Sequence, residues 1–214
     1  MEQAIQHLYE IFAKYDKPRD FPACQCCLSE NEKARLLNGR LKDLSADELS
    51  EYAADIFLTV GEVADFKYFL RRILEISVKD EFLWPDPEVV LSKLSKAGWE
   101  NWSEDERLAV IQLLQDKFNE LLNDPASRGS DIDQWVCALG HCVEDLTPYL
   151  ARMLEASHRD KLLSYVEENL SAYSKNRLSN AFWDSARANE QHVIAWLNQQ
   201  TIKDILSERY GMRF

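Results

Sequence analysis

Residues 63–77 read VADFKYFLRRILEIS, and residues 143–157 repeat this stretch as VEDLTPYLARMLEAS. Seven of the fifteen aligned positions are identical, with no gap. The apolar positions recur at i, i+3, i+4, i+7 and i+8, which places them on one face of a helix. In the two copies these positions are Phe66, Phe69, Leu70, Ile73 and Leu74, and then Leu146, Tyr149, Leu150, Met153 and Leu154. The repeat therefore predicts two similar helices, each with one buried face.

The wider composition favours an all-α fold. Hydrophobic residues make up 46% of the chain, and six Gly and six Pro in 214 residues are few for a protein of many strands and tight turns. A period of about 80 residues is twice the roughly 40 residues of a two-helix HEAT unit. We expect an α-solenoid-like (HEAT-like) array of antiparallel helix pairs in a single domain, residues 1–214, with half-repeats near 45–123 and 131–210 and an N-terminal cap, residues 1–40.

Helix starts are marked by Ser or Thr followed three residues later by an acidic residue, the arrangement of a capping box. These pairs are Ser29 with Glu32, Ser45 with Glu48, Ser103 with Glu106, Ser157 with Asp160, and Thr201 with Asp204. Pro148 suits the first turn of another helix. The pattern predicts helices near residues 2–15, 29–37, 45–58, 63–78, 86–97, 103–123, 131–141, 147–156, 158–172, 176–187, 189–199 and 201–210.

Two connecting segments stand out. Residues 123–130 form a polar stretch with Gly and Pro, which is a candidate boundary between the halves. Residues 80–86 carry Phe82, Leu83, Trp84 and Pro85 and are too apolar for a free linker, so we expect an ordered, packed loop.

The repeat also shares charged residues. Asp65, Arg72 and Glu75 can lie along one flank of the first helix, and the second copy carries the same three residue types. Charges at this spacing predict a stabilising ladder of ion pairs. A paired functional site is the alternative, but it would require these charges to be buried.

Charge and targeting signals bound the partners. With 25 basic and 37 acidic residues the formal net charge is -12, so the average surface repels nucleic acid and anionic lipid. Lys67, Arg71 and Arg72 form a small basic cluster that we interpret as a solvated helix face. The first residues lack a signal peptide and no apolar stretch is long enough to span a membrane, which predicts a cytoplasmic protein with reduced cysteines.

Cys24-Gln25-Cys26-Cys27 is the most unusual local cluster. Thiolates bind zinc, and a tetrahedral site needs further ligands that Cys137 and His141, one helical turn apart, could supply. The candidate metal ligands are therefore Cys24, Cys26, Cys137 and His141, with zinc as the possible cofactor. Two alternatives are inert cysteines that pack as small hydrophobic residues and a redox thiol, which the nearby acidic residues Glu30 and Glu32 disfavour.

The aromatic residues suggest a binding site. Trp99 and Trp102 flank polar residues in a predicted helix connection, where we expect partial exposure and a role as protein-binding anchors. The sequence contains no phosphate-binding loop, zinc-protease motif or calcium loop, and no catalytic residues are assigned. Enzymatic activity is therefore uncertain and less favoured than binding.

Four stretches of the chain carry a resemblance, namely residues 21–27 (FPACQCC), 43–45 (DLS), 52–53 (YA) and 65–75 (DFKYFLRRILE). In these stretches the chain resembles a family of bacterial all-helical proteins of uncharacterised function. Relatives often carry proline at the position of Arg71. The arginine of this chain would leave the helix straighter here. The resemblance implies a bacterial origin and a helical fold, and it brings no established activity.

These observations predict a non-enzymatic, intracellular protein-protein interaction or scaffold module. Stacked helix pairs present extended binding surfaces. The acidic charge favours a basic protein partner, which could include a basic toxin bound by an antitoxin or immunity protein. The alternative is a metal- or thiol-dependent protein that uses Cys24, Cys26 and Cys27.

Overall fold

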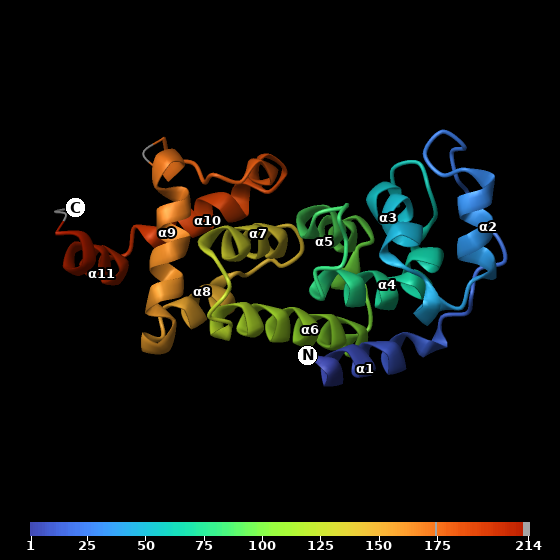
Figure 1. The fold of residues 1–214 in the computed structure, drawn as a ribbon, viewed down its shortest axis with the longest axis horizontal. Coiled ribbons are helices and arrows are strands. Elements are labelled where there is room, and N and C mark those ends of the chain that lie inside the picture. The colour runs from blue at the N-terminus through green and yellow to red at the C-terminus, as the bar shows by residue number, and fades with distance from the viewer. Residues whose placement is uncertain (174, 212–214) are drawn as a thin grey trace. The chain divides into compact units, whose positions relative to one another are not determined.

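The chain is all-helical, which confirms the predicted fold class (Figure 1). A computed structural model describes residues 1–173 and 175–211. In those residues β-pairing is limited to isolated bridges from Val60 to Ala23 and Ile56. The α-helices are α1 (Glu2–Ile11), α2 (Glu30–Asn38), α3 (Ala46–Asp55), α4 (Val63–Val78), α5 (Pro87–Lys96), α6 (Glu104–Asn123), α7 (Gly129–Gly140), α8 (Thr147–Met153), α9 (Arg159–Tyr173), α10 (Arg187–Leu197) and α11 (Gln200–Tyr210). Short 3-10 helices are η1 (Phe12–Lys14), η2 (Leu41–Asp43), η3 (Trp99–Asn101), η4 (Ala156–His158) and η5 (Ala181–Ser185).

Capping explains most of the helix starts. Ser29 and Ser45 form the predicted capping boxes of α2 and α3. Ser103 donates its backbone N–H to Glu106 at the start of α6, over 3.0 Å. The capping box predicted at Thr201 is wrong. Helix α11 begins at Gln200, and its N-cap residue is Gln199. The start predicted at Ser157 falls within η4, and α9 begins two residues later.

The helix predicted for residues 176–187 is wrong. The segment turns instead, since Asn176 adopts a left-handed backbone with φ of 56°. Further on, the side chain of Asn180 accepts a hydrogen bond from the backbone N–H of Phe182 at 2.9 Å. Asparagine side chains compete with helical hydrogen bonds in this way, so only the short helix η5 forms.

The chain divides into two compact units, Met1–Lys117 and Phe118–Phe214. The division falls within α6 and precedes the stretch at residues 123–130, which the sequence suggested as a boundary. That stretch lies inside the second unit as the connection between α6 and α7. The predicted half-repeats of a single domain stay a prediction.

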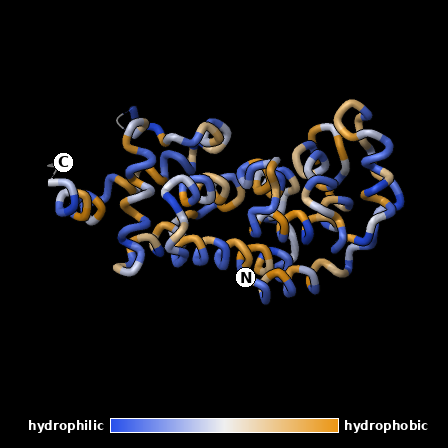
Figure 2. Tube along the Cα trace, viewed as in Figure 1, coloured by the Kyte–Doolittle hydropathy of each residue, from blue (hydrophilic) through white to orange (hydrophobic). Residues whose placement is uncertain are grey.

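The first unit packs around the first copy of the repeat. All five apolar positions of α4 that the repeat defines are buried. Phe69 meets Tyr52 at 4.8 Å and Phe21 at 6.1 Å between ring centroids. In Figure 2 apolar and polar residues alternate along the helices, as expected where each helix buries one face. The same periodicity that predicted the helix therefore supplies the core.

The second copy of the repeat is not one continuous helix. Residues 143–146 precede α8, which has Pro148 in its first turn and ends at Met153. Leu146, Tyr149, Leu150 and Met153 are nevertheless buried, so the apolar pattern keeps its packing role in the second unit.

The charged residues of the repeat follow the prediction in part. Arg72 pairs with Glu75 at 2.9 Å, and Arg152 pairs with Glu155 at the same distance. Asp65 does not join the ladder, because its carboxylate accepts the backbone N–H of Glu62 at 3.0 Å and caps α4. These contacts give the shared charges a structural role.

The second unit contains a close approach between α7 and α9. A Cβ on Gly129 would lie 2.2 Å from the backbone oxygen of Ser164. We expect Gly129→Ala to lower the free energy of unfolding by roughly 1–3 kcal/mol, because backbone must move to accept the methyl group. Urea denaturation measures this, with the exposed neighbour Ser130→Ala as the control. Equal stability of the two variants would contradict the close approach.

Candidate metal centre

Three thiols converge on one loop of the first unit. The sulfur atoms of Cys24, Cys26 and Cys27 all lie within 4.8 Å of one another. Cys26 Sγ and Cys27 Sγ are 3.7 Å apart. Sulfurs that share a zinc ion, each at about 2.3 Å from it, are spaced by roughly 3.8 Å. The three sulfurs are therefore close to the spacing that one ion requires.

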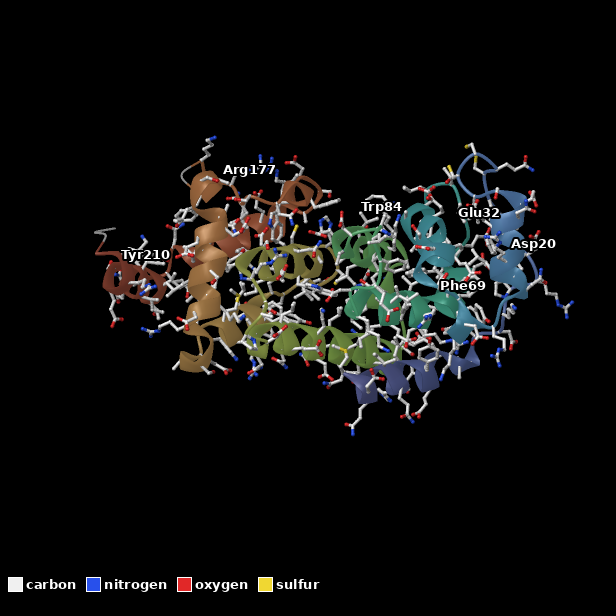
Figure 3. The ribbon with its side chains drawn as sticks, viewed as in Figure 1. Asp20, Glu32, Phe69, Trp84, Arg177 and Tyr210 are labelled. Atoms are coloured by element: carbon white, nitrogen blue, oxygen red, sulfur yellow. The ribbon has the colours of Figure 1, made fainter. Side chains whose placement is uncertain are left out.

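The backbone fixes the two ends of this loop. On the incoming side, Cys24 donates its N–H to the carbonyl of Thr59 at 2.9 Å, and the carbonyl of Pro22 accepts the N–H of Gly61 at 2.7 Å. On the outgoing side, Leu28 is buried and donates its N–H to the carbonyl of Cys24 at 2.9 Å. Figure 3 shows sulfur atoms at the loop that precedes α2. Because the loop is already ordered, binding a metal ion to its thiols would cost little further conformational entropy.

The thiols also perturb one another. Hydrogen bonding from Cys26 and then from Cys27 lowers the pKa of the Cys24 thiol. The same contact, with Cys24 and then Cys27, raises the pKa of Cys26 to about 11. Cys24 is thus the first of the pair to become a thiolate, which is the form that binds metal. A metal ion would have to displace the proton of Cys26.

The surrounding carboxylates are engaged elsewhere. Glu30 accepts a hydrogen bond from Gln25 at 3.1 Å, and Glu32 completes the capping box with Ser29. Across residues 1–173 and 175–211, the group of metal-ligand types around these sulfurs consists of the three cysteines. The site offers three protein ligands and leaves one tetrahedral position for an outside ligand.

The other predicted metal ligands lie in the second unit. Cys137 is buried on α7, and His141 caps the end of that helix. The predicted site of Cys24, Cys26, Cys137 and His141 stays a prediction. The structure groups Cys27 with Cys24 and Cys26, as in the alternative function predicted from sequence, whereas the four predicted ligands did not include it.

The expected exposure of Trp99 is wrong. Gly98 adopts a left-handed backbone with φ of 62°, and Trp99 then enters η3 with 6% of its surface exposed. A buried ring of this kind is not available as an anchor on the surface.

Trp102 is half-buried and belongs to a structural cluster. The ammonium of Lys67 lies 4.1 Å from the centre of its ring and 3.1 Å from Glu106. Burial would raise the pKa of Glu106, but hydrogen bonds from Tyr15, Lys14 and Lys67 outweigh the effect of burial and lower the pKa to about 2. Lys67 is therefore paired with Glu106 inside this cluster and does not contribute to a solvated basic face of α4.

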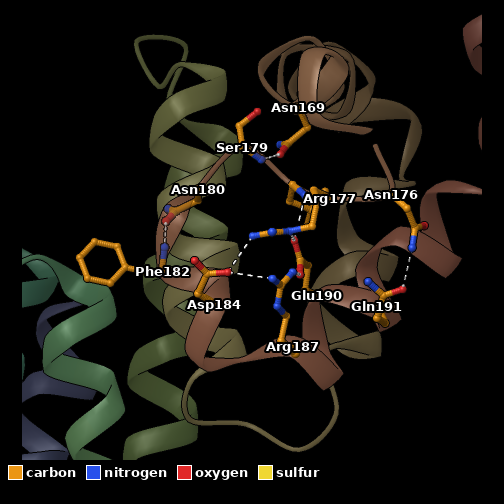
Figure 4. Close-up of polar contacts among 11 residues, drawn as sticks. Asn169, Asn176, Arg177, Ser179, Asn180, Phe182, Asp184, Arg187, Glu190 and Gln191 are labelled. Atoms are coloured by element: carbon orange, nitrogen blue, oxygen red, sulfur yellow. Dashed lines mark hydrogen bonds and ion pairs between the residues drawn. The ribbon is translucent and has the colours of Figure 1, made fainter. Parts of the chain in front are cut away.

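A second polar network orders the segment after α9. Glu190 is buried and accepts hydrogen bonds from Arg177 at 3.0 Å, Arg187 at 2.7 Å and the backbone N–H of Leu178 at 3.0 Å. Figure 4 shows Asp184 between the two arginines. The carboxylate is fully used within the protein, so we assign this network a structural role.

Comparisons with known proteins add no assignment. No protein-family model, curated protein or solved structure matches this chain. Of the helices that the structure describes, none is both long and apolar enough to cross a membrane.

Proposed function

We propose that this protein binds a thiophilic metal ion, with Zn²⁺ as the first candidate, through Cys24, Cys26 and Cys27. The observation that carries the proposal is the convergence of the three sulfurs within 4.8 Å. Thiolates favour zinc and monovalent copper over magnesium, calcium or manganese. The exposed thiol of Cys26 keeps the ion accessible, so the fourth position can receive a ligand from outside this loop.

Elemental analysis tests this function on protein purified under reducing conditions without added metal. We expect close to one zinc per chain, or one copper if that ion is preferred in the cell. The variant Gln25→Ser changes the same loop without removing a thiol, and it should retain the metal. Substoichiometric zinc and copper, together with no binding in a subsequent Zn²⁺ titration, would contradict the proposal.

A second candidate function is the binding of a basic protein, and it rests on the loop at residues 80–86. Leu83 is 97% exposed and Trp84 is 46% exposed, although the sequence predicted that this loop packs. The loop is ordered, because Ser50 donates a hydrogen bond to the carbonyl of Trp84 at 2.8 Å. Trp84 lies beside α3 and α5 at the edge of the first unit (Figure 3). Large apolar side chains on a fixed loop are typical anchors of an interface.

Charge supports a basic partner for this loop. Glu81 and Asp86 flank Leu83 and Trp84, and the whole chain carries a formal charge of -12. A basic partner would associate faster with such a surface, and salt would weaken the attraction. An interaction or scaffold role in the bacterial cytoplasm, without nucleic acid or membrane as the partner, fits this chemistry.

Affinity capture from the native host tests the second function. We expect a reproducible basic partner at low salt, with at least a ten-fold loss of binding for the double variant Leu83→Ser, Trp84→Ala. Leu108→Ser is the control, since Leu108 is also an exposed leucine of the first unit, at 53%. Absence of a partner at low salt, or equal loss in the control, would contradict this function.

The HEAT-like arrangement is part of the same proposal. Equivalent ion pairs at Arg72 and Arg152 support a duplicated unit. Asp65 and Asp145 also accept backbone N–H groups at the starts of the two copies. In this proposal the half-repeats at residues 45–123 and 131–210 form a solenoid-like array of helix pairs.

A further inference from the structure

A groove of about 830 Å³ opens on the first unit, away from the cysteine loop and from residues 80–86. Its size lies within the range of small-molecule sites. Helix α1 forms one wall, while α4 and η2 contribute the opposite side. The residues that line it are Glu2, Gln3, Ile5, Gln6, Tyr9, Glu10, Ala13, Lys42, Arg71 and Glu75.

The unusual residue in this groove is Arg71. Its Nε atom is buried and, among the residues that the structure describes, has no hydrogen-bond partner. The guanidinium lies 5.2 Å from the ring centre of Tyr68 and 5.8 Å from that of Tyr9. Aromatic rings satisfy the charge in part, but a buried donor without a partner costs free energy. A carboxylate bound by the guanidinium would offset this cost.

The nearest carboxylate does not serve Arg71. Glu75 accepts hydrogen bonds from Tyr9 at 2.7 Å and from Lys79 at 3.1 Å, and it pairs with Arg72 at 2.9 Å. The oxygens of Glu75 therefore already accept hydrogen bonds from groups other than Arg71. Arg71 therefore lines the groove with no carboxylate paired to it in the described part of the chain.

The remaining charges of the groove define the ligand. Lys42 lies 4.7 Å from the ring centre of Tyr9 and adds a second positive charge. Glu2 and Glu10, which also line the groove, are exposed. Glu2 pairs with Lys79 at 3.5 Å, and Glu10 accepts a hydrogen bond from Gln6 at 2.9 Å. Three glutamates in the lining repel a doubly charged phosphate. A ligand with one carboxylate and one ammonium would match both kinds of charge.

We infer that this groove binds a free amino acid, whose carboxylate meets Arg71 and whose ammonium lies toward Glu2 and Glu10. The planar guanidinium suits a carboxylate because it can donate two parallel hydrogen bonds. Tyr9 provides an aromatic ring within 5.8 Å of both cations. This site is independent of the metal proposed above.

Thermal unfolding tests the inference with each of the twenty amino acids added singly at millimolar concentration, followed by calorimetric titration of those that raise the midpoint. We expect at least one to bind the wild type, with affinity reduced ten-fold or more in Arg71→Met. Arg35→Met should bind as the wild type does, because Arg35 is exposed on α2 and outside the groove. Arg71→Lys should recover part of the affinity, since it keeps the charge and loses the paired donors.

The unligated variants provide a second readout. If Arg71 serves a ligand, Arg71→Met keeps or raises the midpoint of the unligated protein, because a buried unpartnered donor is removed. The inference is overturned if no amino acid binds, if Arg71→Met binds as well as the wild type, or if inorganic phosphate is the stronger ligand.

Discussion

Cys24→Ser is expected to weaken Zn²⁺ binding by roughly a hundred-fold or more, because it removes one of three thiolate ligands. Cys24 is the sensitive position, since hydrogen bonds from Cys26 and Cys27 lower the pKa of its thiol. Competition with a chromophoric chelator measures the affinity under reducing conditions. Gln25→Ser, in the same loop, should bind as the wild type does. Equal affinities for Cys24→Ser and the wild type would contradict a three-thiol site.

The affinity for Zn²⁺ should also rise with pH. The pKa of Cys26 is raised to about 11, so its thiol is protonated at neutral pH and must release a proton when the ion binds. Each pH unit below that pKa therefore weakens the apparent affinity by about ten-fold for this thiol alone. Chelator competition between pH 6 and 8 measures the slope. An affinity that does not change with pH would show that Cys26 is not a ligand.

Asp133→Asn is expected to stabilise the protein at neutral pH by roughly 3 kcal/mol. Burial raises the pKa of Asp133 from 3.8 to about 6, and the hydrogen bond from Asn169 at 2.8 Å offsets only part of this. Between these two pH values the folded state holds a proton that the unfolded state has lost, so stability falls as pH rises. An asparagine keeps an oxygen acceptor for Asn169 and carries no charge, so it avoids this loss.

Urea denaturation from pH 4 to pH 8 measures the effect as a difference between variant and wild type. The difference should be near zero at pH 4 and reach its maximum above pH 7. Asp131→Asn is the control of opposite sign. Burial would raise the pKa of Asp131, but hydrogen bonds from the side chain and backbone of Arg128 lower it, so its removal should destabilise the protein at neutral pH. A constant difference for Asp133→Asn would contradict a buried, ionisable carboxyl group.

Local signals predicted the helices well because they act within a few residues. The capping boxes at Ser29 and Ser45 and the apolar face of α4 need only the neighbouring turn. The helix predicted for residues 176–187 does not form, because asparagine hydrogen bonds and the ion pairs of Arg177 with Glu190 and Asp184 override the helical pattern of this segment. These ion pairs join positions far apart along the helix-forming pattern, so periodicity cannot reveal them.

The candidate sites depend on tertiary contacts to a greater degree. Sequence spacing identified the cluster of Cys24, Cys26 and Cys27, but the convergence of their sulfurs within 4.8 Å is visible only in the fold. The exposure of Trp99 and Leu83 was predicted in the opposite sense, because exposure is decided by which neighbouring helix covers each side chain. Arg71 appeared as part of a solvated basic face, and its partial burial beside Tyr9 and Tyr68 became visible only in the fold.

X-ray absorption of the Zn²⁺-loaded protein tests the central claim most directly, by counting the sulfur atoms around the ion. The three-thiol site predicts three sulfurs at about 2.3 Å in the wild type and two in Cys27→Ser. A site of Cys24, Cys26, Cys137 and His141 would keep its three sulfurs in that variant. An unchanged sulfur count in Cys27→Ser would therefore contradict the metal centre proposed for this protein.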